Sequence, residues 1–194
     1  MQVNNELSFK ANLVRNIPIK EKNVKKFYVA KRIFEKKSEY DIGTLYLSAL
    51  NKDSEKTSGM LVHIAKNKNQ KKDTFITKSL NELLETMSPK DFAEKMLNIF
   101  KAQSLIFTYN KRCPVVLKLL DKAKSKEEAA IETFKKSKNS GARQRAKINA
   151  EKCRQNQEWL QAELDNFRCY IKRELKKVSK KDPEVEKYIN VNFS

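Results

Sequence analysis

The feature that most restricts the fold of this chain is a long stretch without proline between Pro114 and Pro183. Strong helix formers fill it, so it is expected to be largely helical, because proline interrupts helices more strongly than any other residue. Late in the stretch, six apolar residues recur at spacings of 4, 3, 4, 4 and 3, which place them on one helix face. This set, here called the seam, is Leu160, Leu164, Phe167, Ile171, Leu175 and Val178. A seam of this kind packs against a partner helix.

The sequence NSG at 139–141 interrupts the helical pattern, because these residue types form turns and helix C-caps. A break here predicts a helical hairpin and a short tail, with helices at about 114–124, 126–138 and 142–181. Without the break, residues 125–181 would form one coiled-coil-like helix about 85 Å long. A helix of that length is awkward for a small domain without a partner chain, so the hairpin is the favoured alternative.

The first part of the chain, residues 1–110, is predicted to be a small α+β domain, and residues 111–194 a helical region. In the runs LSFKANLV and FYVAKRIF the large apolar residues fall mostly two apart, which is the period of a strand. Pro18 lies between the two runs, near a bend. They therefore predict short antiparallel strands, arranged as a hairpin. The overall fold class is α+β, dominated by helices.

Two helix starts are predicted within this first part. Ser38 and Asp41 form a capping signal for a helix through EYDIGTLYLSAL. Ser88 followed by Pro89 and Asp91 is the best start in the chain, because Ser caps, Pro fits the first position and Asp faces the positive end of the helix dipole. Downstream of it, one apolar stripe follows at helical spacing, namely Phe92, Met96, Ile99 and Phe100.

The formal net charge of +18 favours contact with nucleic acid or other polyanions. However, Lys outnumbers Arg 34 to 8, and Lys and Asn are residues of A- and T-rich codons, so codon bias is a competing explanation. One basic run, residues 134–147, holds six Lys or Arg and no carboxylate. The candidate polyanion-binding residues in and beside it are Lys136, Arg143, Lys147 and Arg154. Two aromatic residues nearby, Phe134 and Trp159, are predicted to be packing residues.

The sequence contains few residues that could carry out catalysis or bind a metal ion. The chain has one histidine, His63, and three cysteines without a C-x-x-C spacing, so no zinc site or other metal site and no cofactor is predicted. Cys113 is the candidate reactive thiol, because it follows two cations and precedes Pro114, which is expected to open a helix there. An enzyme using Cys113 or His63 ranks third among the functions considered.

The leading functional hypothesis is a non-enzymatic interaction or scaffold module, whose seam mediates homodimerisation or binds a partner protein. The alternative is a protein that binds nucleic acid or another polyanion through the basic run at 135–154. The chain starts without the charged head and apolar block of a signal peptide, and its apolar runs are too short for a transmembrane segment. A cytoplasmic location is therefore expected.

Overall fold

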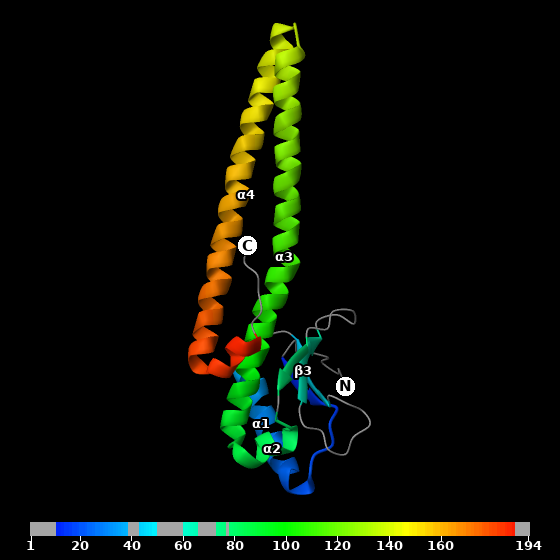
Figure 1. The fold of residues 1–194 in the computed structure, drawn as a ribbon, viewed down its shortest axis with the longest axis vertical. Helices are drawn as coiled ribbons and strands as arrows, with labels where there is room; N and C mark the ends of the chain where they lie inside the picture. Colours follow the sequence, from blue (N-terminus) through cyan, green and yellow to red (C-terminus); the bar gives the residue numbers. More distant parts are fainter. Residues whose placement is uncertain (1–10, 39–42, 50–59, 66–72, 77, 189–194) are drawn as a thin grey trace, which may run out of the picture. The chain divides into compact units, whose positions relative to one another are not determined.

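The structure of the chain is a computed structural model. It describes residues 11–38, 43–49, 60–65, 73–76 and 78–188, and most of these residues are helical. The chain divides into two compact units (Figure 1). The first, here called the sheet unit, comprises Met1–Ser104 and Lys177–Val191. The second, here called the hairpin unit, comprises Leu105–Lys176 and Asn192–Ser194. The expected division at residue 110 instead falls inside a continuous helix.

A four-stranded sheet with the order β1-β2-β3-β4 forms the centre of the sheet unit. The strands are β1 (Asn12–Arg15), β2 (Thr44–Ala49), β3 (Met60–Ala65) and β4 (Asp73–Ile76). Strands β1 and β2 are parallel, with Leu13 opposite Leu45, whereas the pairs β2–β3 and β3–β4 are antiparallel. The prediction of an antiparallel strand hairpin at the start of the chain is therefore wrong, because β1 pairs in parallel with a strand that follows a helical crossover.

That crossover is helix α1 (Glu21–Lys37), which contains the run FYVAKRIF that was predicted to be a strand. Phe27, Ala30 and Phe34 are buried, at spacings of 3 and 4, so the buried face follows the helical period. The apolar residues of the run fit both the strand period and the helix period, and packing on the sheet selects the helix. Glu21 in the first turn and two lysines in the last turn also match the helix dipole.

The predicted helix through EYDIGTLYLSAL is also wrong, because its second half is strand β2. Leu45 and Leu47 are fully buried and alternate with less buried neighbours, as in a strand covered on one face. Gly43 precedes the strand with φ of 146°, a backbone conformation that favours glycine. The beginning of the predicted helix, residues 39–42, and residue 50 lie outside the described residues.

Helix α2 (Leu80–Thr86) and the start of helix α3 (Pro89–Lys136) complete the core of the sheet unit. The predicted start of α3 is confirmed, since the backbone N–H of Asp91 donates to Ser88 Oγ at 3.1 Å. The stripe from Phe92 to Phe100 is buried, and the Phe100 ring meets Phe34 edge-on at 5.6 Å between centroids. Farther along the helix, Gln103 Nε2 donates to the backbone carbonyl of Val62 at 2.9 Å. This bond ties α3 to strand β3.

The end of the described chain returns to the sheet unit through the 3-10 helix η1 (Pro183–Tyr188). Lys95 Nζ lies 3.5 Å from the carboxylate of Asp182 and 2.5 Å from that of Glu184, and the Lys95 side chain is largely buried. Val185 is also buried. An ion pair and an apolar contact thus anchor this segment within the unit.

The hairpin unit consists of the remainder of α3 and most of helix α4 (Ser140–Lys181), which run side by side to the turn that joins them (Figure 1). The turn occupies residues 137–139, and Asn139 caps α4 by accepting a bond from the N–H of Ala142 at 3.1 Å. Of the two alternatives, the chain therefore adopts the broken helix. The separate helices predicted at 114–124 and 126–138 are one helix, because α3 continues through Pro114.

Pro114 stands in the interior of α3, where it lacks the N–H that would bond to the carbonyl of Asn110. We predict that Pro114→Ala stabilises the protein by up to about 3 kcal/mol, because alanine restores this bond and removes the ring clash. Pro89→Ala is the matched control, since Pro89 is the first helical residue, where proline is tolerated. Thermal unfolding followed by circular dichroism measures both; an unchanged or lower Tm for Pro114→Ala would contradict the prediction.

Candidate functional site

The seam residues are buried, apart from Phe167, which is half-buried. In the hairpin unit, α3 presents its own buried apolar face along the corresponding stretch, formed by Cys113, Val116, Leu120 and Ala123. The Phe167 ring stacks on that of Tyr109, with centroids 6.1 Å apart and the rings 16° from parallel. Val178 is buried in the sheet unit. The part of the seam in the hairpin unit is thus covered within the same chain.

Polar contacts between the two helices accompany the buried apolar contact in their antiparallel pairing. Nearer the turn, Glu127 accepts from Arg154 Nε at 3.2 Å and from Gln157 Nε2 at 2.6 Å. Farther from the turn, Arg112 pairs with Glu163 and stacks over the Phe167 ring at 5.0 Å from its centroid. Both ion pairs involve partly exposed arginines, so each contributes little stability by itself, and their main effect is to fix the register of the helices.

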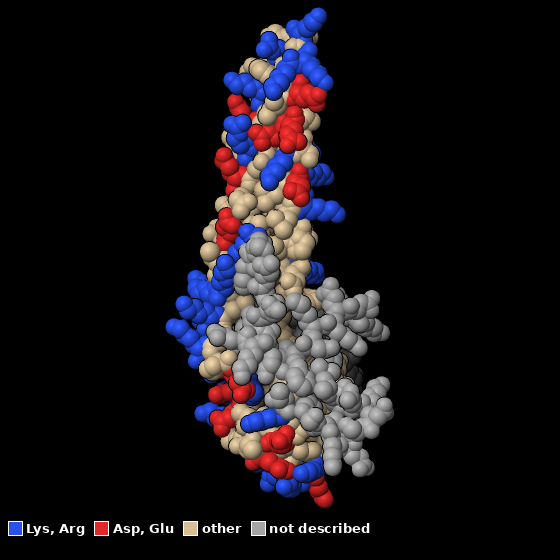
Figure 2. Space-filling view, in the orientation of Figure 1, with Lys and Arg blue, Asp and Glu red and all other residues tan. Residues whose placement is uncertain are grey.

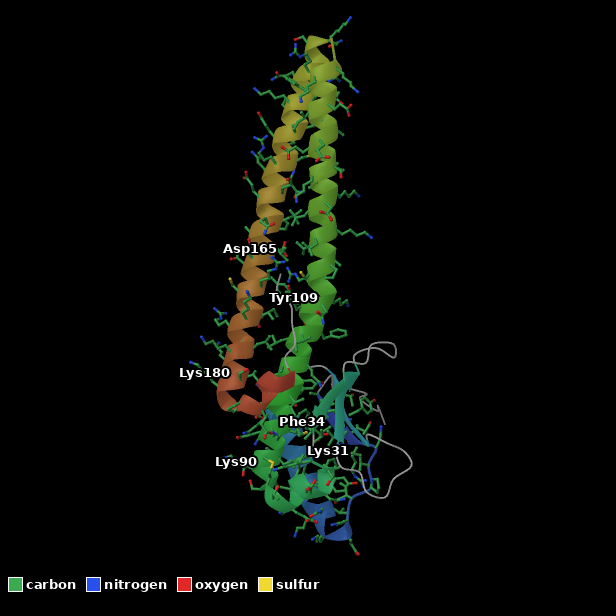
Figure 3. All side chains as sticks on the ribbon, in the orientation of Figure 1. Lys31, Phe34, Lys90, Tyr109, Asp165 and Lys180 are labelled. Carbon is green, nitrogen blue, oxygen red and sulfur yellow. The ribbon has the colours of Figure 1, made fainter. Side chains whose placement is uncertain are left out.

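Tyr109 lies between the two helices (Figure 3), where its hydroxyl hydrogen-bonds to Cys113 and to Arg168. Burial raises the pKa of the Tyr109 phenol, the hydrogen bond with Cys113 adds to the increase, and Arg168 opposes it. The hydrogen bond with Tyr109 in turn raises the pKa of the Arg168 guanidinium. The cluster connects the helices, and near neutral pH the Tyr109 phenol remains protonated and the Arg168 guanidinium remains charged.

Cys113, the candidate reactive thiol, lies in the interior of α3 and is buried. The prediction placed it at the positive end of a helix that Pro114 would open, but no helix begins there. That reason for an activated thiolate is therefore absent, and Cys113 is buried beside Tyr109. The other candidate for catalysis, His63, belongs to β3, and its side chain lies outside the described part of the structure.

The turn end of the hairpin carries a group of Lys and Arg side chains (Figure 2). It lies between Glu132, the last carboxylate of α3, and Glu151, the first carboxylate of α4. This region, here called the basic tip, contains Lys135, Lys136, Lys138, Arg143, Arg145 and Lys147. Lys136 forms an ion pair with Glu132 at 2.5 Å, and Arg145 Nε donates to the backbone carbonyl of Gly141 at 3.3 Å. The first turn of α4 contains no acidic residue.

The four candidate polyanion-binding cations occupy different settings in the structure. Lys136 ends α3, Arg143 stacks over the Phe134 ring at 4.9 Å from its centroid, and Lys147 is exposed. Arg154 lies farther along α4 and is bonded to Glu127. The turn therefore brings the first three to one end of the hairpin, whereas Arg154 joins the contacts that hold the helices together.

The sequence prediction for Trp159 is wrong, because its side chain is 62% exposed and does not belong to the packed interior. Trp159 immediately precedes Leu160, so it lies about 100° around the helix from the seam. The helical spacing already indicated this exposure, because Trp159 does not fall on the helix face that the seam residues occupy. Phe134, by contrast, is half-buried beneath Arg143.

Across the part of the chain that the structure describes, no group of three or more His, Cys, Asp or Glu side chains is arranged to hold a metal ion. No helix among the described residues combines the length and apolarity needed to span a membrane. Comparison of the chain with protein-family models, with curated proteins and with solved structures finds no match. The hairpin unit, which contains most of the seam and the basic tip, is the candidate functional site.

We predict that the seam stabilises the chain's own fold. Leu164 is 1% exposed, so Leu164→Ala should cost about 2–4 kcal/mol of unfolding free energy, whereas Gln161→Ala on the exposed face should change it by less than about 0.5 kcal/mol. Denaturant unfolding measures both. Because the seam is covered within one chain, the Tm should be independent of protein concentration; a Tm that rises with concentration would indicate pairing between chains.

We predict an alkaline loss of stability from Tyr109. Because the phenol pKa is raised in the folded state, the unfolded state releases its proton first as the pH rises past about 10, and stability then falls. Tyr109→Phe should therefore lose less stability than the wild type between about pH 9 and pH 11. Tyr170→Phe, which removes an exposed phenol, is the control. Equal losses for wild type and Tyr109→Phe in urea unfolding would contradict the prediction.

Proposed function

We propose that this protein is a non-enzymatic binding module whose helical hairpin binds a polyanion at its basic tip, with nucleic acid as the ligand class. The observation that carries the proposal is the concentration of six cations around one turn, without a carboxylate from residue 133 to residue 150. The hairpin brings the basic end of one helix against the basic start of the next. A surface of this kind attracts phosphate-rich ligands through its charge alone.

The arrangement of charge at the start of α4 also supports the proposal. Helix starts normally carry acidic residues, because their backbone N–H groups form the positive end of the dipole. Here the first two turns carry Arg143, Arg145 and Lys147 instead. These cations repel one another and the dipole, and the stacking of Arg143 on the Phe134 ring offsets only part of this repulsion. A bound anion would offset both effects, which makes binding a better explanation for them than stability.

The leading hypothesis from the sequence, homodimerisation or partner binding through the seam, receives less support from the geometry. The part of the seam in the hairpin unit is buried against α3 of the same chain. A second helix could reach it only if the hairpin opened. We therefore assign this part of the seam to the packing of the hairpin and the binding role to its charged exterior.

Binding should depend steeply on salt. We predict that labelled oligonucleotides bind at low ionic strength, and that changing Lys138, Arg143 and Lys147 together to Gln lowers the magnitude of the slope of log K against log salt by about 2–3. The loss should be similar for single strands and duplexes, because phosphate contacts carry no sequence information. Fluorescence anisotropy across a salt series measures both quantities.

The matched control removes three exposed cations from one helix of the sheet unit, by changing Lys25, Arg32 and Lys36 of α1 to Gln. This variant loses the same net charge as the tip variant. If the two variants weaken binding equally, the effect comes from net charge and the basic tip is not the site. Failure of the wild-type protein to bind either kind of nucleic acid at low salt would overturn the proposed function.

A further inference from the structure

Three large exposed apolar residues recur on α4 at intervals of eleven residues. They are Ile148, Trp159 and Tyr170, which are 41%, 62% and 46% exposed. Eleven residues make three helical turns with a remainder of about 20°, so all three lie within about 40° on one face of α4. The face is about 33 Å long and lies beside the buried seam. Packing within the hairpin does not explain why three apolar side chains are exposed along one line of α4.

Helix α3 adds exposed apolar residues to the same side of the hairpin. The ion pair between Arg112 and Glu163 marks this side on both helices. On α3, Val115 and Leu119 follow Arg112 by three and seven residues and are 57% and 47% exposed. On α4, Trp159 precedes Glu163 by one turn. This surface, here called the Trp159 side, is therefore shared by the two helices.

The Trp159 side is positively charged. On α4, Arg145, Lys152 and Arg173 lie within about 40° of Trp159 around the helix axis. On α3, Lys122 and Lys126 follow Leu119 by three and seven residues and are exposed. Cations thus border the exposed apolar residues on both helices.

The carboxylates of the hairpin unit are either turned away from this side or paired. On α4, Glu151, Glu158 and Asp165 lie about 80° to 120° around the helix from Trp159. The two nearer carboxylates, Glu163 and Glu174, are bonded to arginines, Glu163 to Arg112 and Glu174 to Arg173. No carboxylate of α3 within the hairpin unit lies closer than about 80° to Leu119. An anionic partner is therefore complementary to the Trp159 side.

The spacing of the apolar residues narrows the class of partner. A second copy of the chain would bring cations against cations in a two-fold contact, which charge repulsion disfavours. A protein or lipid surface would require contiguous apolar area, whereas Ile148, Trp159 and Tyr170 are separated by about 16 Å of largely polar helix. Isolated aromatic rings between cations suit a single-stranded nucleic acid, whose bases stack on rings while its phosphates meet Lys and Arg.

We propose that a single-stranded nucleic acid follows the Trp159 side from the basic tip, with a base stacked on Trp159. The inference rests on the proposed function, because Arg145 belongs both to the tip and to this side. Trp159 is the principal stacking residue, since the Tyr170 ring is already approached by the Arg173 guanidinium at 5.7 Å from its centroid. Ile148, Val115 and Leu119 provide apolar contacts for neighbouring bases and sugars.

The chain contains a single tryptophan, so its intrinsic fluorescence reports on Trp159 alone. The test titrates the full-length protein at low salt with an oligo(dT) of about 15 nucleotides, and with the same strand in a duplex with oligo(dA). Stacking predicts strong quenching of Trp159 by the single strand and little quenching by the duplex, whose bases are not accessible. Equal quenching by the two would overturn the inference.

Affinity of labelled oligo(dT) for Trp159 variants, measured by anisotropy, provides the second readout. Trp159→Leu keeps an apolar side chain but removes the stacking ring, and should weaken single-strand binding about 5- to 100-fold while leaving duplex binding unchanged. Trp159→Phe should restore part of the affinity. Tyr28→Leu, which removes an exposed aromatic residue of the sheet unit, is the matched control and should bind as the wild type does.

The outcomes separate this inference from the proposed function. If Trp159→Leu binds the single strand as tightly as the wild type while the tip variant loses affinity for both ligands, the inference fails and the proposed function stands. If the wild type binds neither ligand, both fail. If vesicles of phosphatidylserine and phosphatidylcholine shift Trp159 emission to the blue while oligo(dT) leaves it unchanged, the Trp159 side binds lipid and the inference is overturned.

Discussion

The burial of one narrow apolar stripe between two long helices is the interaction on which the hairpin unit depends. Isolated helices are marginal in water, and most of their stability in proteins comes from packing an amphipathic face. In this unit the stripe consists of large side chains from Leu160 to Leu175, whereas Ala123 and Ala146 occupy it toward the turn. Large residues supply most of the apolar area, and small residues let the helices approach closely near the turn. Every exposed feature of the hairpin is positioned by this contact.

Arginine has a distinct use in this lysine-rich chain. Six of its eight arginines lie in the hairpin unit. Arg112 and Arg154 bond to carboxylates of the facing helix, Arg143 and Arg112 stack on aromatic rings, and Arg168 bonds to Tyr109. A planar guanidinium can stack and bond at once, which a lysine ammonium cannot do. The arginines therefore help fix the register of the helices, and lysines provide much of the exposed positive charge.

The two proposals concern neighbouring parts of the hairpin, which share Arg145 and offer two kinds of contact. The tip offers charge without accessible aromatic rings, since Phe134 is covered by Arg143. The Trp159 side offers an exposed ring among fewer cations. The proposals assign to the tip an affinity that falls with salt, and to the exposed ring a preference for unpaired bases. A rigid helix keeps the separation between these contacts constant.

The sequence by itself determined the helical character of the second half of the chain, the start of α3 at Ser88 and the buried face of α4. These features are set by local chemistry, namely caps, the absence of proline and a sustained helical period, and α3 even extends past Pro114.

Only the tertiary structure decided features that depend on partners distant in sequence. The run from Phe27 to Phe34 fits either period, and packing on the sheet made it a helix. The parallel pairing of β1 with β2 follows from that crossover. In the same way, the turn and the pairing of α3 with α4 decided which cations gather at the tip and left Trp159 outside, because the face a helix exposes depends on which face its neighbour covers.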